Sequence, residues 1–228
     1  MFRGTAKPLP LFRATFSPGA RLLTNRGQDS RLLDGVFEGR PAAYGAVVCS
    51  WGLHATLVAD SDTPEYRKFG AERFKMAAKE ALNPLDGSPH PYQGSFEIQR
   101  AAGEPIKHPR QEHGYILITP VSQLEAGFTI SPASKPLDGK LRLVEFGRLS
   151  GEEAMEIMKK AYDGGKHVED GRVGYHEVES VKITIREEDA RWRRVCLDGK
   201  IIQLEQDGWV EVTGPVEGVV DLVVNLEC

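Results

Sequence analysis

The feature that constrains this chain most is a succession of short apolar segments separated by glycine- and proline-rich turns. The 228 residues contain 24 glycines and 14 prolines, spread along the chain rather than gathered in one linker. Many short strands with turn signals between them favour a sheet protein over a succession of βαβ units. We therefore expect a β-rich α+β fold, an antiparallel β-sandwich with two main helices, forming a single domain over 1–228.

Apolar runs and alternation predict the strands. Residues 42–50 are almost continuously apolar and are expected to form a buried strand, whereas 21–43 reads as a loop or a weak hairpin. Asp198-Gly199 lies between two apolar segments and predicts a tight hairpin turn. The predicted strands are 9–16, 42–50, 95–99, 114–120, 141–146, 180–185, 192–197, 201–204, 209–212 and 219–226.

Two segments have helical spacing of their apolar residues. Thr63 and Pro64 suit the N-cap and the first position of a helix over 63–82. Ser150 begins a capping box for a second helix over 150–162. These two helices are expected to pack on the sheet through their apolar faces.

Charge and composition exclude several classes of protein. A formal net charge of -4 with no basic block argues against a nucleic-acid-binding protein. No apolar run approaches the roughly 20 residues that span a bilayer, and no secretory signal is evident. We therefore expect a cytoplasmic protein, peripheral to membranes. Cys49, Cys196 and Cys228 form neither a disulfide framework nor a zinc motif, and the first two are expected to be buried thiols.

No common nucleotide-binding, hydrolase or metalloprotease motif is present, so the chemistry must be sought in local clusters. His90, His108 and His113 lie in a proline- and glycine-rich stretch, and their loose spacing predicts solvated loop histidines rather than metal ligands. Residues 191–194 read Arg-Trp-Arg-Arg, which suits either a phosphate-binding patch or an alternating strand whose charge the acidic residues 187–189 offset.

The segment from Ser50 to Arg73 contains the largest group of candidate binding residues. Asp60 and Asp62 precede the predicted helix, where carboxylates are stabilised by the helix dipole. Arg67 and Arg73 are six residues apart, about 240° around a continuous helix, so they would not share one face. Two diverging arginines could still reach a polyanion from neighbouring turns.

This segment resembles a known family. Ser50-Trp-Gly-Leu, Ala59-Asp60 and the run Glu-Tyr-Arg-Lys-Phe-Gly-Ala-Glu-Arg-Phe at 65–74 look like the C-terminal half of fungal sphingosine (long-chain base) kinases, within the diacylglycerol-kinase catalytic superfamily. Weaker agreement continues through 136–144 to the turn Leu197-Asp198-Gly199. The resemblance spans roughly 50–200.

The resemblance implies a fold and a set of site residues. The chain is expected to be the C-terminal, lipid-binding domain of the lipid-kinase fold, without the N-terminal α/β domain whose Gly-Gly-Asp-Gly-Thr loop binds ATP and supplies the catalytic base. No catalytic residue and no metal ligand are therefore expected in this chain. The residues implied are Ser50, Trp51, Leu53 and Asp60 for the lipid, and Arg67, Arg73, Asp198 and Gly199 for the nucleotide.

The implied activity is transfer of the γ-phosphoryl group of ATP to a hydroxyl of a sphingoid base or diacylglycerol. ATP and Mg²⁺ serve the intact enzyme, and this chain alone is expected to hold neither and to be inactive. Expected partners are the lipid substrate, the N-terminal ATP-binding domain and a membrane surface, with no nucleic acid. Asp60 hints at a cationic amine, whereas Lys200 stands where the family has a glutamate. The alternative is a standalone, non-catalytic lipid-binding module.

Overall fold

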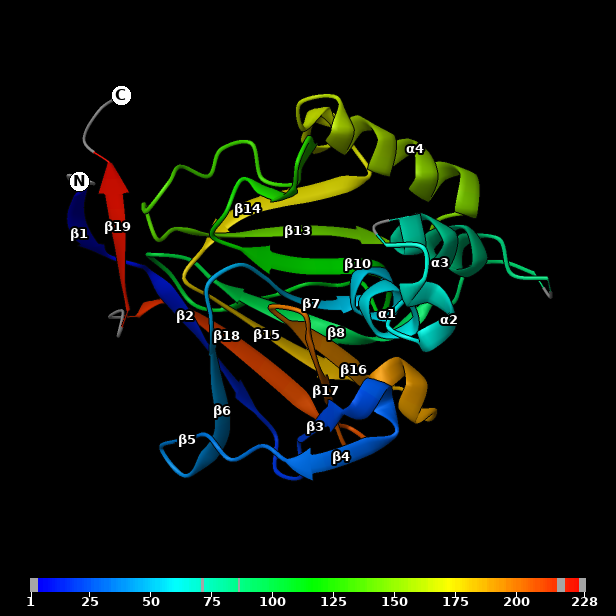
Figure 1. Cartoon of the computed structure of the whole chain (residues 1–228), viewed down its shortest axis with the longest axis horizontal. Helices are drawn as coiled ribbons and strands as arrows, with labels where there is room; N and C mark the ends of the chain where they lie inside the picture. The colour runs from blue at the N-terminus through cyan, green and yellow to red at the C-terminus, as the bar shows by residue number, and fades with distance from the viewer. Residues whose placement is uncertain (1–3, 71, 86, 217–219, 226–228) are drawn as a thin grey trace.

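The fold is built on one large antiparallel sheet that curls around an apolar core. The structure is a computed structural model that describes residues 4–70, 72–85, 87–216 and 220–225. Within these ranges, fifteen strands join one sheet, and helices lie against one part of its outer face (Figure 1). The longest path through the sheet runs β4-β3-β17-β16-β7-β10-β8-β15-β18-β2-β6-β5.

The strands of this sheet are β2 (Leu11–Phe16), β3 (Arg21–Thr24), β4 (Asp29–Leu32), β5 (Val36–Phe37), β6 (Arg40–Gly45), β7 (Cys49–Gly52), β8 (Tyr92–Gln99), β9 (Ile106–Lys107), β10 (Glu112–Thr119), β13 (Leu141–Gly147), β14 (Val173–Val178), β15 (Ser180–Ile185), β16 (Arg194–Leu197), β17 (Lys200–Gln203) and β18 (Trp209–Val216). Two small ribbons pair β1 (Gly4–Pro8) with β19 (Asp221–Asn225) and β11 (Gln123–Glu125) with β12 (Phe128–Thr129). The helices are α1 (Leu53–Asp60), α2 (Pro64–Arg67), α3 (Glu72–Leu82) and α4 (Gly151–Tyr162), with 3-10 turns η1 (Asn25–Gly27), η2 (Lys166–Glu169) and η3 (Ala190–Arg193).

Strand β10 is where the sheet branches. Its first residues pair with β8, its later residues pair with β7, and its other edge pairs with β13. Side chains alternate across β10, so Ile116 and Ile118 point into the core enclosed by the curled sheet, while Tyr115 and Leu117 point toward the helices. Burial on both faces explains why β10 reads as an apolar run rather than an alternating one.

The helices cover the outer face of β7, β10 and β13 and form a second core with them. Leu53 of α1, Leu82 of α3 and Ile157 of α4 are buried there against Tyr115 and Phe146. The capping box predicted at Ser150 is present. No helix among the described residues is long and apolar enough to cross a bilayer.

Most predicted strands are confirmed, including 180–185 to the residue and a hairpin at 21–32. The predicted strand 42–50 is wrong as one unit, because Asp198 holds the loop 46–48 out of the sheet and separates β6 from β7. The predicted strand 192–197 begins later, at Arg194, after the turn η3. Strand β14 was not expected.

The predicted helix 63–82 is also wrong as one unit. It is broken into α2 and α3, and Gly70, at the break, has a φ of 56°. Thr63 caps α2 as expected, since its hydroxyl accepts the Tyr66 N–H. An additional helix, α1, precedes both and ends at Asp60, while Thr63 is the N-cap of the following helix α2. The helix-capping interpretation of Asp60 is therefore wrong.

Helix α1 begins where the backbone of Gly52 turns directly off β7. Gly52 has a φ of 90°, and a Cβ at this position would lie 2.9 Å from the carbonyl oxygen of Gly114 in β10. The left-handed backbone and the close approach both require glycine. The direction in which α1 leaves the sheet depends on this residue.

We expect Gly52→Ala to lower the free energy of unfolding by about 3 kcal/mol, because alanine is strained at a φ of 90° and its Cβ would overlap the Gly114 carbonyl oxygen. Gly39→Ala is the control, because Gly39 has a φ of 75° and, apart from its chain neighbours, no atom of the described residues lies within 4 Å of its Cβ position. It should lose only about 1 kcal/mol. Urea unfolding of both variants measures this, and equal losses would contradict the close-approach argument.

Candidate functional site

Helix α1 separates two cavities. Leu53, Thr56 and Asp60 lie on the face of α1 that lines a cavity of about 510 Å³. His54 and Val58 lie on the other face and line a cavity of about 430 Å³. We call the first the aromatic cavity and the second the arginine cavity, after the side chains that distinguish them.

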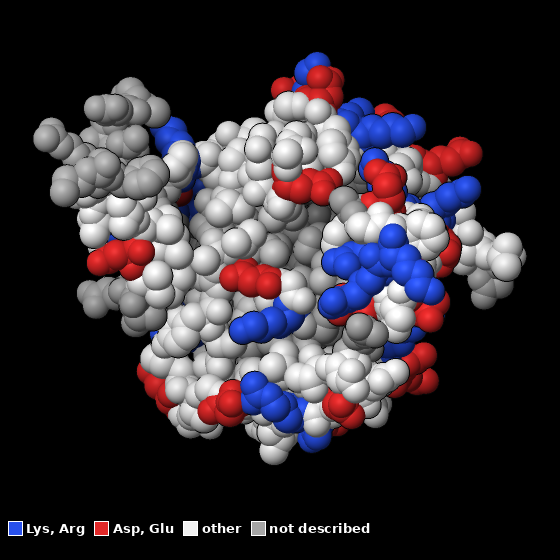
Figure 2. All heavy atoms as spheres, in the orientation of Figure 1, with Lys and Arg blue, Asp and Glu red and all other residues white. Residues whose placement is uncertain are grey.

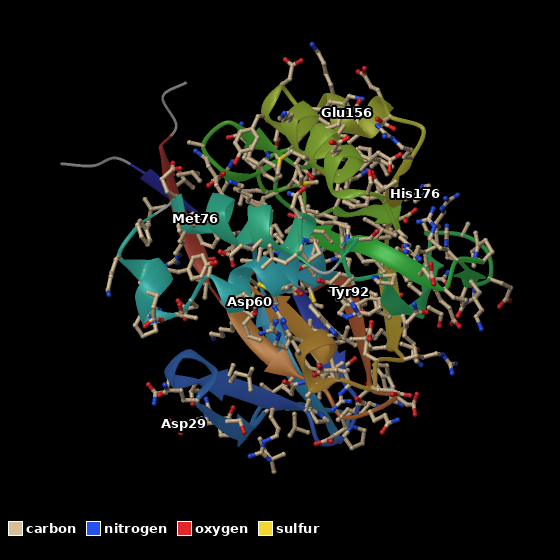
Figure 3. All side chains as sticks on the ribbon, turned by 90° about the vertical axis from the view of Figure 1, so that its right-hand side faces the viewer. Asp29, Asp60, Met76, Tyr92, Glu156 and His176 are labelled. Carbon is tan, nitrogen blue, oxygen red and sulfur yellow. The ribbon has the colours of Figure 1, made fainter. Side chains whose placement is uncertain are left out.

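The aromatic cavity lies between α1, α3, the start of α4 and the sheet. Figure 3 shows Asp60 and Tyr92 near the middle of this side of the molecule, with Met76 of α3 and Glu156 of α4 above them. The cavity is lined by Leu53, Thr56, Asp60, Thr63, Tyr66, Ala77, Glu80, Ala81, Leu82, Pro84, Ser88, Pro89, His90, Pro91, Tyr92, Gly114, Phe146, Arg148, Leu149, Ala154, Arg191 and Trp192.

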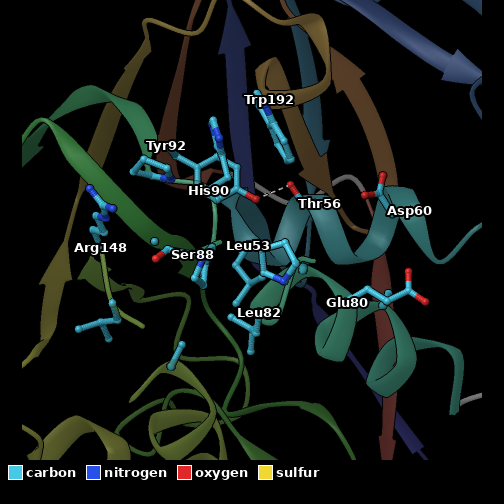
Figure 4. Close-up of a pocket in the computed structure, with 18 of the residues that line it drawn as sticks. Leu53, Thr56, Asp60, Glu80, Leu82, Ser88, His90, Tyr92, Arg148 and Trp192 are labelled. Carbon is cyan, nitrogen blue, oxygen red and sulfur yellow. Dashed lines mark hydrogen bonds between the residues drawn. The ribbon is translucent and has the colours of Figure 1, made fainter. Parts of the chain in front are cut away.

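One wall of this cavity is a packed aromatic group. The His90 ring stacks on Trp192 with centroids 4.1 Å apart, and Tyr92 meets both rings edge-on. The buried hydroxyl of Tyr92 donates to Thr56 Oγ1 at 2.7 Å, which ties the wall to α1 (Figure 4). Glu187 fixes His90 through a 2.9 Å contact at Nε2. The rings therefore present a rigid surface of the kind that binds apolar ligands.

Asp60 stands at the polar side of the same cavity, and its carboxylate is already paired. Arg191 contacts one oxygen at 2.8 Å and Arg194 contacts the other at 2.8 Å. Arg191 also lies over the Trp192 ring, 4.5 Å from its centroid. Two guanidinium groups on one carboxylate leave this corner with a net positive charge.

The opposite wall combines a polar pair with apolar side chains. Glu80 accepts a hydrogen bond from Tyr66, which raises the pKa of Tyr66 to about 12 and keeps the phenol protonated. Leu82 and Phe146, both buried, also line the cavity. The cavity thus has an apolar interior and polar groups at its rim, which suits an amphiphile with a hydroxylated or charged head group.

The arginine cavity lies on the other side of α1. It is lined by Val47, Val48, His54, Val58, Asp62, Arg67, Arg73, Phe74, Leu124, Cys196, Asp198 and Gly199. Four of the residues implied for the nucleotide, Arg67, Arg73, Asp198 and Gly199, are brought together here. Figure 2 shows Lys and Arg side chains gathered over α2 and the start of α3, beside this region.

The two arginines share the cavity because the helix breaks between them. Arg67 belongs to α2 and pairs with Asp62 at 2.7 Å, whereas Arg73 belongs to α3 and lies over the Phe74 ring. Arg73 forms no ion pair with the described residues, and its Nε is buried without a hydrogen-bond partner among them. An orphaned buried donor in a cavity wall fits an anionic ligand, so these residues could hold the phosphates of a nucleotide.

Asp198 organises a loop at the edge of this cavity. Its carboxylate accepts the N–H groups of Ala46, Val47 and Val48 at 2.7, 3.0 and 2.7 Å. Asp198 and Gly199 have φ values of 47° and 81° and form the predicted two-residue hairpin turn. Asp198 therefore shapes the wall through the backbone of 46–48.

Two of the four residues implied for the lipid line the aromatic cavity, and two do not. Leu53 and Asp60 are in its wall. Ser50 and Trp51 are fully buried, and the indole N–H of Trp51 donates to the Trp192 carbonyl at 2.9 Å. Ser50 and Trp51 can influence a ligand only through the residues they hold.

Sequence reasoning did not assign two residues of the aromatic cavity, His90 and Trp192, to a binding site. His90, expected to be a solvated loop histidine, lies in the aromatic wall. His113 is fully buried in β10, where desolvation lowers its pKa to about 4. Trp192 could have been found from the Arg-Trp-Arg-Arg cluster at 191–194, but the alternating strand expected there is a 3-10 turn.

The burial of Cys49 and Cys196 is confirmed, whereas Cys228 lies outside the described residues.

Comparisons with known proteins bear on this arrangement. No protein-family model matches the sequence, and no curated protein sequence matches it. The crystal structure of a candidate diacylglycerol kinase from Bacillus anthracis aligns over 98% of this chain with a TM-score of 0.53 and 15% sequence identity. Another candidate diacylglycerol kinase structure from that organism aligns over 97% with a TM-score of 0.50 and 13% identity.

The chain shares the fold of these bacterial proteins. It spans 59% of the first and 58% of the second, which is less than two thirds of either. At this level of identity the comparison concerns the fold, and the assignment of chemistry depends on the two cavities.

We expect Asp198→Asn to lower the free energy of unfolding by about 1–3 kcal/mol, because the amide cannot accept all three backbone N–H groups. Asp34→Asn is the control, since within the described ranges Asp34 pairs only with the exposed Arg31 and exposed pairs contribute little. Denaturant unfolding of both variants checks this. Equal stabilities would contradict the role given to the Asp198 carboxylate.

Proposed function

We propose that this chain is the lipid-pocket part of an ATP-dependent lipid kinase. The intact enzyme would transfer the γ-phosphoryl group of ATP, with Mg²⁺, to a hydroxyl of diacylglycerol or a sphingoid base. The observation that carries the proposal is the pair of cavities on either side of α1, one apolar and aromatic, the other lined by arginines. Their occurrence on the fold of candidate diacylglycerol kinases supports it.

The proposal assigns a cavity to each substrate. The aromatic cavity would take the acyl or sphingoid chain against Leu53, Leu82 and Phe146, with the head group toward Asp60. The arginine cavity would take the nucleotide phosphates at Arg67 and Arg73. ATP supplies the phosphoryl group when bound, and the base that deprotonates the lipid hydroxyl would come from an N-terminal ATP-binding domain. In that arrangement this chain is the β-sandwich-like C-terminal domain.

The arginine cavity favours the kinase over a standalone lipid-binding module. A protein that only carries a lipid needs one apolar cavity, whereas this chain keeps a second cavity with a buried guanidinium nitrogen that lacks a partner among the described residues. Orphaned buried donors are costly, and a bound anion would satisfy this one. We also propose that the protein is cytoplasmic and peripheral to membranes, where its substrates reside.

Asp60 bears on the lipid class. An ammonium group would have to compete with Arg191 and Arg194 for a carboxylate whose two oxygens are both engaged. Arg191 is the more accessible of the two, with 55% of its side chain exposed against 13% for Arg194. A sphingoid amine would therefore displace Arg191, while a diacylglycerol hydroxyl needs no displacement.

Filling the aromatic cavity tests the lipid site. We expect Ala81→Trp to lower the affinity for a fluorescent diacylglycerol in detergent micelles by tenfold or more, about 1.4 kcal/mol, because the indole occupies the space of the chain. Lys79→Trp, on the same helix α3 but exposed and outside the lining, is the matched control. Equal affinities for the two variants would show that the lipid does not bind in this cavity.

Removing Arg191 tests the head-group argument. We expect Arg191→Ala to raise the affinity for sphingosine relative to diacylglycerol by about tenfold, since one Asp60 oxygen becomes free for the amine. Arg148→Ala is the control, because it removes a positive charge from the same cavity without touching Asp60. If both variants leave the ratio of affinities unchanged, Asp60 does not face the head group.

A further inference from the structure

A chain of polar contacts runs from the 198–199 turn to the wall of the arginine cavity. Cys196 lies directly opposite Ser50 in the pairing of β16 with β7. Its sulfur lies near Ser50 and the backbone of Gly199, and both interactions lower the pKa of the thiol against the larger, opposite effect of burial. Ser50 Oγ in turn lies 2.7 Å from Nδ1 of His54, which lines the cavity.

The direction of this chain follows from what each group can donate. Burial raises the pKa of the Cys196 thiol to about 11, so the thiol keeps its proton, and its sulfur already accepts the Gly199 N–H. Sulfur is a weak acceptor and imidazole nitrogen a strong one, so the Ser50 hydroxyl donates to His54 Nδ1. The Ser50 proton is therefore given to His54 Nδ1 rather than to the sulfur of Cys196.

This direction fixes the state of His54. With Nδ1 accepting, the ring proton of the neutral imidazole is on Nε2. Burial lowers the pKa of His54 to about 4, so the ring is neutral at pH 7. Nε2 makes no hydrogen bond within the described part of the chain, and the same cavity contains the unpartnered Nε of Arg73.

We propose that His54 is a binding residue of the arginine cavity, donating its Nε2–H to an anionic phosphate ligand, with Ser50 as the residue that positions it. The inference rests on the proposed function in taking that ligand to be a phosphate. A neutral donor in the same cavity as Arg67 and Arg73 orients the anion without adding charge. Ser50, fully buried, reaches the ligand only through His54.

The tautomer is tested without any ligand. Long-range 1H–15N spectra of the 228-residue chain at pH 7 should show His54 as the Nε2–H tautomer. Ser50→Ala should convert it to a mixture, because Nδ1 loses its donor, while His176 should keep its wild-type pattern. A wild-type His54 with its proton on Nδ1 would overturn the proposal.

Binding is tested with inorganic pyrophosphate by calorimetry. We expect His54→Ala to weaken binding about five- to tenfold, Ser50→Ala to weaken it less, and His54→Gln to restore part of the affinity through its amide N–H. His176→Ala is the control histidine, on β14 away from the cavity. Thermal melts confirm that each variant is folded.

The outcomes separate this inference from the proposed function. The inference would be overturned if the wild-type chain does not bind pyrophosphate, or if a folded His54→Ala variant binds it with wild-type affinity. Neither result would contradict the proposed lipid site. Pyrophosphate binding that depends on His54, in a chain that binds no lipid, would support the inference and overturn the lipid kinase.

Discussion

The close approach of Gly52 to Gly114 is the constraint from which the site follows. The backbone of β7 lies close to that of β10 at this point, so α1 begins directly at the sheet and packs against it. Its first residue, Leu53, is buried in the outer core. The helix then divides the space between the sheet and the segments that cover it, and each of its faces becomes the wall of a different cavity.

Most charged side chains of the two cavities form ion pairs instead of gathering into a patch of one sign. Asp60 is held by Arg191 and Arg194, Arg67 by Asp62, and His90 by Glu187. These partly exposed pairs add little to stability, but they fix the positions of side chains that face the cavities. Arg73 differs, since it has no ion-pair partner among the described residues. A ligand could therefore engage this cation without breaking an ion pair to the described residues.

The sequence predicted the elements that obey local rules. The capping box at Ser150, the Asp-Gly hairpin and the alternation of 180–185 are each set by neighbouring residues. Helix α1 was missed because it has only eight residues and is apolar on most of its faces. No single apolar stripe therefore marks it as a helix. The break at Gly70 was missed for the opposite reason, since the pattern of 63–82 is helical on both sides of it.

The site was partly predictable for a related reason. Arg67, Arg73, Asp198 and Gly199 were named together from a resemblance, and the structure brings them into one cavity. Periodicity alone would have separated Arg67 from Arg73. His90 and Trp192 were not assigned to a cavity, because their stacking joins residues about a hundred positions apart, and nothing local signals such a contact. The role of Asp198 depends on three N–H groups in a distant loop.

The division by α1 also links the two cavities. The segment that follows the helix alternates between them: Thr63 and Tyr66 line the aromatic cavity, whereas Asp62 and Arg67 line the arginine cavity. A shift of this segment changes both walls at once. Under the proposed function, such a shared wall would hold the acceptor and the donor in a fixed relation, which is the contribution that positioning makes to phosphoryl transfer.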